Sequence, residues 1–235
     1  MKGLTGKRVL ITGGANGIGK AITQRFVCEG CIVFVADIDA NELARLDTDQ
    51  IHPLVLDISN RKSVRHQLSR MELDILVNNA AITSGDDYER IMAVNCNGTR
   101  YVTETVLAGM KKRKKGNIIF ITSVHTAMAF PGDCSYDASK HWAVGYMRAR
   151  ALELAPLGIR VNAVAPGAID NAGTQVGVKN RIKDYLGKKI PLRRMGDPRE
   201  IASAVAFLAS GEANYITGAE FRVDGGLSIK NPLID

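Results

Sequence analysis

A glycine-rich turn near the N-terminus is the feature that most constrains how this chain can fold. Residues 8–12 (RVLIT) are typical of a short buried strand, and residues 13–19 (GGANGIG) follow as a turn. Apolar side chains then recur at helical spacing through Ile18, Ile22 and Phe26. Glycines let backbone amides approach a phosphate closely, and a helix N-terminus adds partial positive charge there. The segment therefore predicts the first half of a nucleotide-binding βαβ unit.

An acidic residue closes the second predicted strand of this unit. Residues 32–36 (IVFVA) form the strand, and Asp37 follows where such units place the acid that binds a ribose. A carboxylate accepts hydrogen bonds from both ribose hydroxyls and repels a 2′-phosphate, and residues 38–41 contain no Arg or Lys to offset it. We therefore expect NAD rather than NADP; the alternative interpretation of Asp37 is a solvated acid at a strand end.

Tyr136 and Lys140 form the second informative pattern. They are four residues apart in a run with helical periodicity that ends near Pro156, so both point to one side of a helix. A free tyrosine has a pKa of about 10, and a neighbouring cation favours its phenolate, so the pair suits proton transfer. Ser123 follows the apolar run 117–122, which places its hydroxyl at a strand's carboxyl end. Such pairs are also common on ordinary helix surfaces. The catalytic interpretation of this pair therefore depends on the nucleotide site predicted in the same chain.

Taken together, these patterns resemble the short-chain dehydrogenase/reductase family over essentially the whole chain. The motifs that carry the resemblance occur in the family's order: the glycine-rich loop from Thr12 to Gly19, the pair Asp57 and Ile58, the strand end 78–81 (NNAA), the four residues Asn95, Ser123, Tyr136 and Lys140, and the pair Pro166 and Gly167. The resemblance implies one α/β Rossmann domain over residues 1–235. It also implies hydride transfer between a nicotinamide cofactor and a secondary alcohol or its carbonyl.

The resemblance implies which residues hold the NAD cofactor. They are Gly13, Asn16, Gly17, Ile18, Gly19, Asp37, Asp57, Ile58, Asn79, Ala80, Tyr136, Lys140, Pro166, Gly167, Ile169 and Asn171. Within this set, Asp57 and Ile58 would contact the adenine, and Pro166 and Gly167 would hold the nicotinamide. No metal is expected.

The catalytic residues that the resemblance implies are Asn95, Ser123, Tyr136 and Lys140. Tyr136 would exchange a proton with the substrate oxygen, and Ser123 would hold that oxygen in place. Lys140 would lower the Tyr136 pKa and bind the nicotinamide ribose. Asn95 would order a water that connects Lys140 to solvent; the alternative is a polar residue that caps local backbone.

The expected substrate-binding residues are Ser123, His125 and Tyr136. The sequence from Ser123 to His125 and residues 166–169 (PGAI) look similar to the family's sugar dehydrogenases, whereas residues 215–226 are also similar to its 3-oxoacyl-thioester reductases. We expect a sugar or polyol substrate, with an oxoacyl thioester or another ketone as the alternative. His125 is equally compatible with a packed structural histidine. A catalytically silent NAD-sensing or scaffold protein is the non-enzyme alternative, since fold alone does not fix function.

The chain departs from the family pattern in three places. Ala81 replaces a glycine, and Asn171 stands where the family has a threonine that contacts the nicotinamide, so Thr174 is an alternative contact. Segment 82–94 is shorter than is usual in the family, which predicts an open site or one covered by a neighbouring subunit. Residues 172–189 contain three glycines and are the expected substrate lid.

Composition is consistent with one α/β domain of seven parallel strands flanked by helices. The 235 residues are 46% hydrophobic, and strand and helix patterns alternate throughout. Further strands are expected at 74–78, 160–165 and 220–224. In the helix after Tyr136, a buried stripe is expected at Trp142, Met147, Ala151 and Leu154. No apolar stretch approaches a membrane span, so we expect a cytoplasmic protein.

Charge and cysteine content bear on the possible partners. The formal charge of +7 raises nucleic-acid binding, but the dense run 111–115 (KKRKK) suits a helix C-terminus, so no such partner is expected. The four cysteines are expected to be reduced. Family members usually form tetramers or dimers, so the expected partners are a small alcohol or carbonyl substrate and further copies of the chain.

Overall fold

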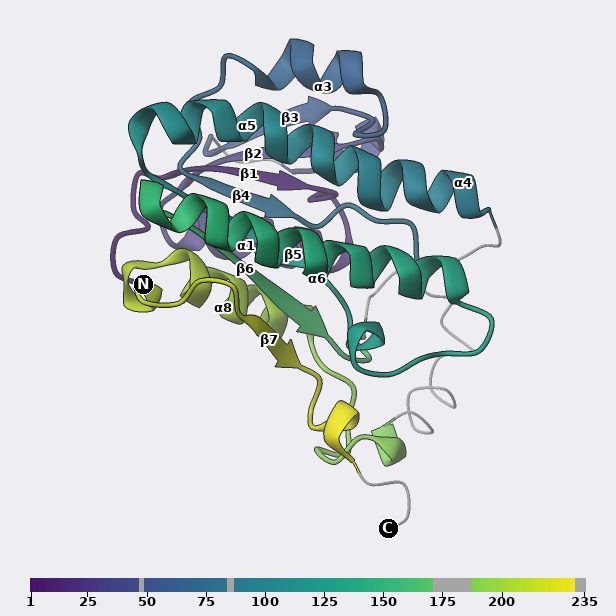
Figure 1. Cartoon of the computed structure of the whole chain (residues 1–235). Coiled ribbons are helices and arrows are strands. Elements are labelled where there is room, and N and C mark those ends of the chain that lie inside the picture. Colours follow the sequence, from purple (N-terminus) through teal and green to yellow (C-terminus); the bar gives the residue numbers. More distant parts are fainter. Residues whose placement is uncertain (47–48, 84–86, 171–186, 231–235) are drawn as a thin grey trace.

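The structure, a computed structural model, describes residues 1–46, 49–83, 87–170 and 187–230. Seven strands form one parallel sheet in the order β3-β2-β1-β4-β5-β6-β7 (Figure 1). They are β1 (Arg8–Thr12), β2 (Ile32–Asp37), β3 (Ile51–Val55), β4 (Ile75–Asn78), β5 (Gly116–Ile121), β6 (Ile159–Pro166) and β7 (Glu220–Val223). The predicted Rossmann-type sheet of seven parallel strands is confirmed.

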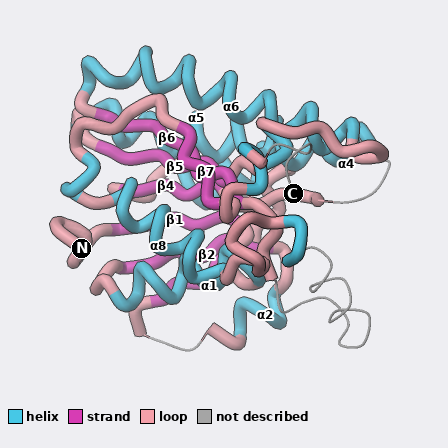
Figure 2. The backbone as a smooth tube through the Cα atoms, turned by 90° about the horizontal axis from the view of Figure 1, so that it is seen from below, coloured by secondary structure: helices cyan, strands magenta, loops and turns pink. Residues whose placement is uncertain are grey.

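Helices cover both faces of this sheet. They are α1 (Gly17–Cys28), α2 (Ala40–Ala44), α3 (Arg61–Leu68), α4 (Tyr88–Ile91), α5 (Thr99–Arg113), α6 (Cys134–Leu154) and α8 (Pro198–Ala209). Figure 2 shows α1 and α8 on one face and α5 and α6 on the other. Within the described residues, no helix combines the length and the apolar character needed to cross a membrane.

Two apolar cores lie between the helices and the sheet. On one face, Phe26 of α1 and Val205 of α8 pack against alternate side chains of β1 and β2. On the other, Val106 of α5 and Met147 of α6 pack against the opposite side chains of β4 and β5. Since both faces are covered, central strands are mostly apolar, as in β4, where Ile75, Leu76 and Val77 precede the buried Asn78.

The edge strand β3 is the strand that the sequence pattern does not locate. It contains Pro53 and the exposed His52, which interrupt an apolar run. Proline lacks a backbone N–H and is tolerated at a sheet edge, where no further strand needs that donor. Strand β3 nevertheless pairs with β2, in a register that runs from Val33 with Ile51 to Asp37 with Val55. Its place in the sheet therefore follows from tertiary packing and not from a local sequence pattern.

The buried stripe of α6 differs in one position from the expected one. Met147, Ala151 and Leu154 are buried as predicted, but Trp142 is only half-buried. The Trp142 ring instead stacks on Tyr146, with centroids 4.9 Å apart. Lys140 takes the buried position at the start of the stripe, with 6% of its surface exposed.

The order of strands places a ligand-binding point at the centre of the sheet. The chain runs from β1 outward to β3 and then returns to β4 on the other side of β1. In open α/β sheets, such a reversal leaves a crevice at the carboxyl ends of the two central strands, where ligands bind. The glycine-rich turn follows β1 at this point.

Candidate active site

The carboxyl ends of β1 and β4 are joined by a set of short hydrogen bonds. The Thr12 hydroxyl accepts from the backbone amides of Asn79 and Ala80, both at 3.1 Å. The Asn79 side-chain amide donates to the carbonyls of Thr12 at 3.0 Å and Gly13 at 2.8 Å. These contacts hold the glycine-rich turn at the reversal point, and they bring together Gly13 and Asn79, two of the residues predicted to bind the cofactor.

The glycine-rich turn is too tight to admit side chains at two of its positions. A Cβ on Gly13, whose φ is +63°, would lie 2.8 Å from the Ala80 Cα. A Cβ on Gly19 would lie 2.0 Å from the Gly13 carbonyl oxygen. The backbone therefore needs glycine at both positions. We call the turn and the start of α1 the cradle.

The start of α1 fits an anionic group. The N-cap residue Asn16 forms no capping hydrogen bond with its side chain, and the first turn, from Gly17 onward, has no acidic residue. Ile18, in this first turn of α1, packs against the apolar core. Uncapped amides and the helix dipole together suit a phosphate, so the turn fits the pyrophosphate of a dinucleotide.

Asp37 is the last residue of β2, and Asp57 follows the end of β3. The Asp37 carboxylate accepts from the Ala15 amide at 3.1 Å and the Asp39 amide at 3.2 Å, which fixes it beside the glycine-rich turn. Asp57 accepts from the amide and the hydroxyl of Ser59, at 2.8 and 2.7 Å, and is exposed. Ile58 is buried beneath Gly98, so its adenine contact stays a prediction.

Ser123, Tyr136 and Lys140 come together beyond the carboxyl end of β5. Ser123 is buried and caps the short 3-10 helix Val124–Thr126. Its hydroxyl lies close enough to the Tyr136 hydroxyl to lower the pKa of Tyr136. The Lys140 ammonium lies 5.4 Å from the centre of the Tyr136 ring and donates to the Ile121 carbonyl at 2.9 Å. A proton donor, an oxygen-binding hydroxyl and a cation thus share one site.

Burial controls the protonation of this group and corrects one expectation. It raises the pKa of Tyr136 to about 12, with the Ser123 hydrogen bond opposing that rise and the charges of Asp133 and Asp137 adding to it. Burial also lowers the pKa of Lys140 to about 8. The Tyr136 pKa is thus raised where a lowered pKa was expected, because the loss of water around the phenolate outweighs the effect of Ser123. The stabilisation of the phenolate by Lys140 stays a prediction.

Asn95 lies in a π-helical turn, Met92–Gly98, between α4 and α5. Its side-chain oxygen accepts from the Ile82 amide at 2.8 Å, and its nitrogen donates to the Ile82 carbonyl and the Ser139 hydroxyl, both at 3.0 Å. These bonds tie the segment after β4 to α6, next to Lys140. They agree with the backbone-capping interpretation, and the water-ordering role stays a prediction. Nothing in the sequence pattern signals the π-helical turn, although such turns are frequent at functional sites.

His125 lies against the catalytic group. Its backbone amide donates to the Ser123 hydroxyl at 3.3 Å, and its ring meets the Tyr136 ring edge-on, with centroids 5.0 Å apart. The ring stacks on Phe130 at 4.0 Å and its Nδ1 is hydrogen-bonded to Asp137. Asp137 was not singled out by any sequence motif, because its partner lies twelve residues away in a loop.

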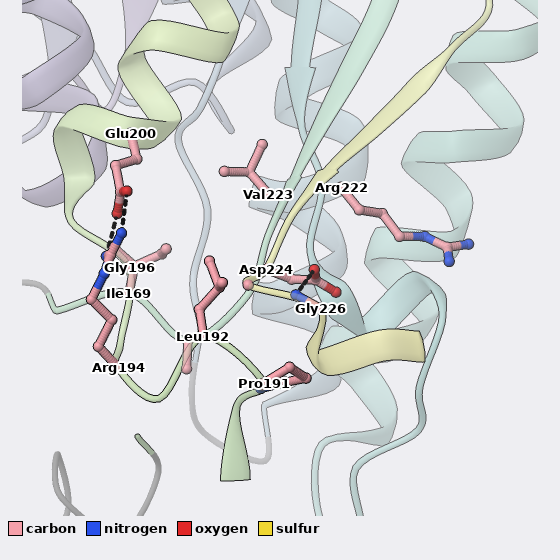
Figure 3. A pocket seen from close by; sticks show the side chains of 12 residues that line it. Ile169, Pro191, Leu192, Arg194, Gly196, Glu200, Arg222, Val223, Asp224 and Gly226 are labelled. Atoms are coloured by element: carbon pink, nitrogen blue, oxygen red, sulfur yellow. Dashed lines mark hydrogen bonds and ion pairs between the residues drawn. The ribbon is translucent and has the colours of Figure 1, made fainter. Parts of the chain in front are cut away.

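The segment after β6 borders a cavity of about 450 Å³ (Figure 3). The Gly167 amide donates to the Val223 carbonyl at 3.0 Å, and a Cβ on Gly167 would lie 2.7 Å from Asp224. Pro166 ends β6, and Ile169 lines the cavity and pairs with Gly196. The Arg194 guanidinium forms two hydrogen bonds to the Glu200 carboxylate at its rim, at 2.7 and 2.6 Å.

Part of the expected site lies outside the described residues. Asn171, the alternative contact Thr174 and residues 172–186 of the lid belong to that part. Residues 187–189 are described and are helical. No group of three or more His, Cys, Asp or Glu side chains arranged for a metal occurs among the residues that the structure covers.

The fold and the site together define a class of protein. A parallel sheet with a glycine-rich turn at its reversal point and a Ser–Tyr–Lys group at the next strand end is that of a nicotinamide-dependent oxidoreductase with a Rossmann fold. A family model described as enoyl-(acyl carrier protein) reductase matches residues 13–228. The chain belongs to the short-chain dehydrogenase/reductase family.

Three similar proteins show the range of this family. The chain is 37% identical to the 3-oxoacyl-(acyl-carrier-protein) reductase FabG of Thermotoga maritima, over 96% of this chain and 99% of the relative. The ligand-free aldohexose dehydrogenase of Thermoplasma acidophilum has a TM-score of 0.90 and 33% identity, over 97% of this chain and 96% of the other. A 3-oxoacyl-(acyl-carrier-protein) reductase of Brucella melitensis, solved with bound NAD, has a TM-score of 0.88 and 30% identity, over 96% and 92%.

Proposed function

We propose that this protein is an NAD-dependent dehydrogenase that oxidises a secondary alcohol group of a sugar or polyol. The observation that carries the proposal is the joint placement of Ser123, Tyr136 and Lys140 beside the cradle for a dinucleotide. When bound, NAD supplies the acceptor for the hydride that leaves the alcohol carbon. Tyr136 would first lose its own proton to solvent and then, as the phenolate, take the hydroxyl proton of the alcohol, so the net products are a carbonyl compound, NADH and a proton.

Each residue of the group has a distinct part in this proton transfer. Ser123 donates to the substrate oxygen and keeps it within reach of the Tyr136 hydroxyl. Tyr136, with its pKa raised to about 12, holds its proton at neutral pH and is ready to donate it in the reductive direction. In the oxidative direction, the nearby Lys140 ammonium stabilises the phenolate that must form transiently.

Asp37 supports NAD as the cofactor. Two backbone amides hold its carboxylate beside the glycine-rich turn, and the negative charge opposes a 2′-phosphate. The Brucella melitensis relative, solved with bound NAD, shows that this family includes proteins that bind the same cofactor.

The choice of substrate rests on His125 and on the relatives. The imidazole beside Ser123 and Tyr136 is a polar group suited to a second substrate hydroxyl, and the Thermoplasma acidophilum neighbour is an aldohexose dehydrogenase. The second candidate is reduction of a 3-oxoacyl thioester, favoured by the identity to the Thermotoga maritima reductase. A silent sensing role is disfavoured by the intact catalytic group.

A homo-oligomer is part of the proposal. Strand β7 is an edge strand of the sheet, and an unpaired edge is a ready site for pairing with another chain. A second copy that covers this edge satisfies the free backbone groups of residues 220–223.

Two assays separate the candidate substrates. In the first, purified protein receives NAD with aldoses and polyols; in the second, it receives NADH or NADPH with an acetoacetyl thioester. The proposal expects turnover in the first assay that exceeds turnover in the second by at least about tenfold in kcat/KM. Turnover of the thioester alone would contradict the proposal and identify the protein as a 3-oxoacyl-thioester reductase.

A further inference from the structure

Three contacts hold the His125 side chain in place, whereas a solvent-facing histidine is free to rotate. Its Nδ1 is hydrogen-bonded to Asp137, one face stacks on Phe130 with an interplanar angle of 21°, and the ring is perpendicular to the Tyr136 ring at 87°. Because hydrogen bond, stack and edge contact come from different directions, they leave the ring one orientation.

The partner of His125 is itself anchored. The second Asp137 oxygen accepts from the Phe130 amide at 3.2 Å, so one carboxylate fixes both the His125 ring and the residue on which it stacks. The side chains of His125 and Asp137 are only 16% and 15% exposed. Burial raises the pKa of Asp137, but the hydrogen bonds from His125 and Phe130 outweigh it, so the carboxyl stays below its ordinary range. The pair is therefore a protected carboxylate and imidazole, unlike a surface ion pair.

The carboxylate decides which ring nitrogen carries the hydrogen. A carboxylate only accepts, so Nδ1 is the donor of the neutral ring, and Nε2 is left as an acceptor. Nε2 has no hydrogen-bond partner in the part of the chain that the structure describes. Nε2 of His125 is therefore an oriented acceptor next to the hydroxyls of Ser123 and Tyr136, and a hydroxyl of the substrate could donate a hydrogen bond to it.

We propose that Asp137 is a positioning residue that fixes His125 as a hydrogen-bond acceptor for a second substrate hydroxyl next to the reacting carbon. The protein then selects vicinal diols, as in sugars and polyols, over simple secondary alcohols. This inference rests on the proposed function and deepens it. Asp137 lies in α6, the helix that carries Tyr136, and its carboxylate contacts His125 and Phe130, so it acts through the imidazole and not on the substrate.

The test compares Asp137→Ala and Asp137→Asn with Asp133→Asn. Asp133 is the N-cap residue of the same helix, and its charge acts on Tyr136 as that of Asp137 does, but among the described residues its side chain forms no hydrogen bond or ion pair with His125. Each variant is assayed with NAD on a vicinal diol and on the simple secondary alcohol of the same carbon skeleton. Asp137→Ala should raise KM for the diol by about tenfold, with kcat and the simple alcohol much less affected. Asp133→Asn should shift both substrates alike.

A second readout needs no turnover. Imidazole 15N resonances of the folded protein should show the Nδ1–H form of His125 in the unmodified chain and in Asp133→Asn, and a mixture of the two neutral forms in Asp137→Ala. Equal loss of kcat on both substrates, or an unchanged 15N pattern, would overturn the inference. If the unmodified protein turns over no diol at all, the proposed function fails, while the 15N pattern still decides the Asp137 contact. If Asp137→Ala does not fold, Asp137→Asn keeps the backbone bond to Phe130 and supports both measurements.

Discussion

Tyr136 and Lys140 show that one burial event moves two pKa values in opposite directions. Removal from water disfavours the charged form of each, so the pKa of Tyr136 rises to about 12 and that of Lys140 falls to about 8. A neutral tyrosine and a lysine that is charged but easily discharged suit a site that passes one proton in either direction. The same burial means that the charged form of Lys140 lowers the free energy of unfolding.

Replacing Lys140 should therefore stabilise the protein while abolishing its activity. A pKa lowered from 10.5 to about 8 means that the buried charge opposes folding below pH 8, an effect that fades as the pH rises through the window from 8 to 10.5. Loss of the bond to the Ile121 carbonyl offsets part of the gain. Lys140→Met should raise the free energy of unfolding by about 1–2 kcal/mol at pH 7 and by less at pH 9.5. Urea denaturation at both pH values measures this difference; a variant less stable at pH 7 would contradict it.

A second prediction at the residue scale is that Asp37 selects NAD over NADP. Asp37→Asn keeps an oxygen for the Ala15 amide but removes the charge, so the ratio of kcat/KM for NADP to that for NAD should rise at least about tenfold. Asp39→Asn is the matched control, since Asp39 caps α2 through the Asn41 and Glu42 amides and should leave the ratio unchanged. An unchanged ratio in Asp37→Asn would show that another group selects the cofactor.

At the scale of elements, the turn between β1 and α1 does the most to create the site. Its shape follows from contacts with β4, since the Thr12 hydroxyl and the Asn79 amide join the two strand ends. A side chain in the turn would collide with backbone atoms, which cannot rotate away.

Gly19→Ala should therefore cost both stability and NAD binding. The new Cβ would lie 2.0 Å from the Gly13 oxygen and 2.6 Å from the Asn79 amide nitrogen, so the turn must shift. We expect a loss of about 1–3 kcal/mol in unfolding free energy and at least about tenfold weaker NAD binding by calorimetry. Gly145→Ala, in α6 with nothing within 4 Å of the new Cβ, should instead be neutral or stabilising. Equal behaviour of the two variants would refute the close-contact explanation.

The elements differ in how well the sequence predicts them. Strands β1, β2, β4, β5, β6 and β7 were predicted to within two residues at each end, because buried parallel strands are continuous apolar runs. Strand β3 and the π-helical turn at Asn95 were missed, since Pro53 breaks the pattern and no residue type marks a π-helical turn. The Asp137–His125 contact was missed because it forms only when the loop after β5 folds back on α6.

At the scale of the whole molecule, helices cover both faces of the sheet, and β3 and β7 form its two edges. The glycine-rich turn follows β1, the Ser123–Tyr136–Lys140 group lies beyond β5, and the cavity lies at the ends of β6 and β7 (Figure 3), all at the carboxyl ends of the strands. A ligand that bridges β1, β4 and β5 at this end contacts both halves of the sheet. Binding of such a ligand should consequently stabilise the whole domain against unfolding.

Saturating NAD should raise the midpoint of thermal unfolding. At about 100 times its Kd, a ligand that binds only the folded state adds about 3 kcal/mol, which for a chain of this size corresponds to about 5–10 °C. Differential scanning fluorimetry with NAD and with NADP at equal concentration provides the comparison. A larger shift with NADP would contradict the role given to Asp37.

The central claim is that the buried Tyr136 transfers a proton while NAD is reduced. Its most direct test is the rate of NADH formation from NAD on a panel of aldoses and polyols, measured for the unmodified protein and for Tyr136→Phe. The account predicts turnover of at least one such substrate and a fall of about 10²–10⁴ in kcat for the phenylalanine variant, which keeps the ring but lacks the hydroxyl. Equal NADH formation by the two proteins would contradict it.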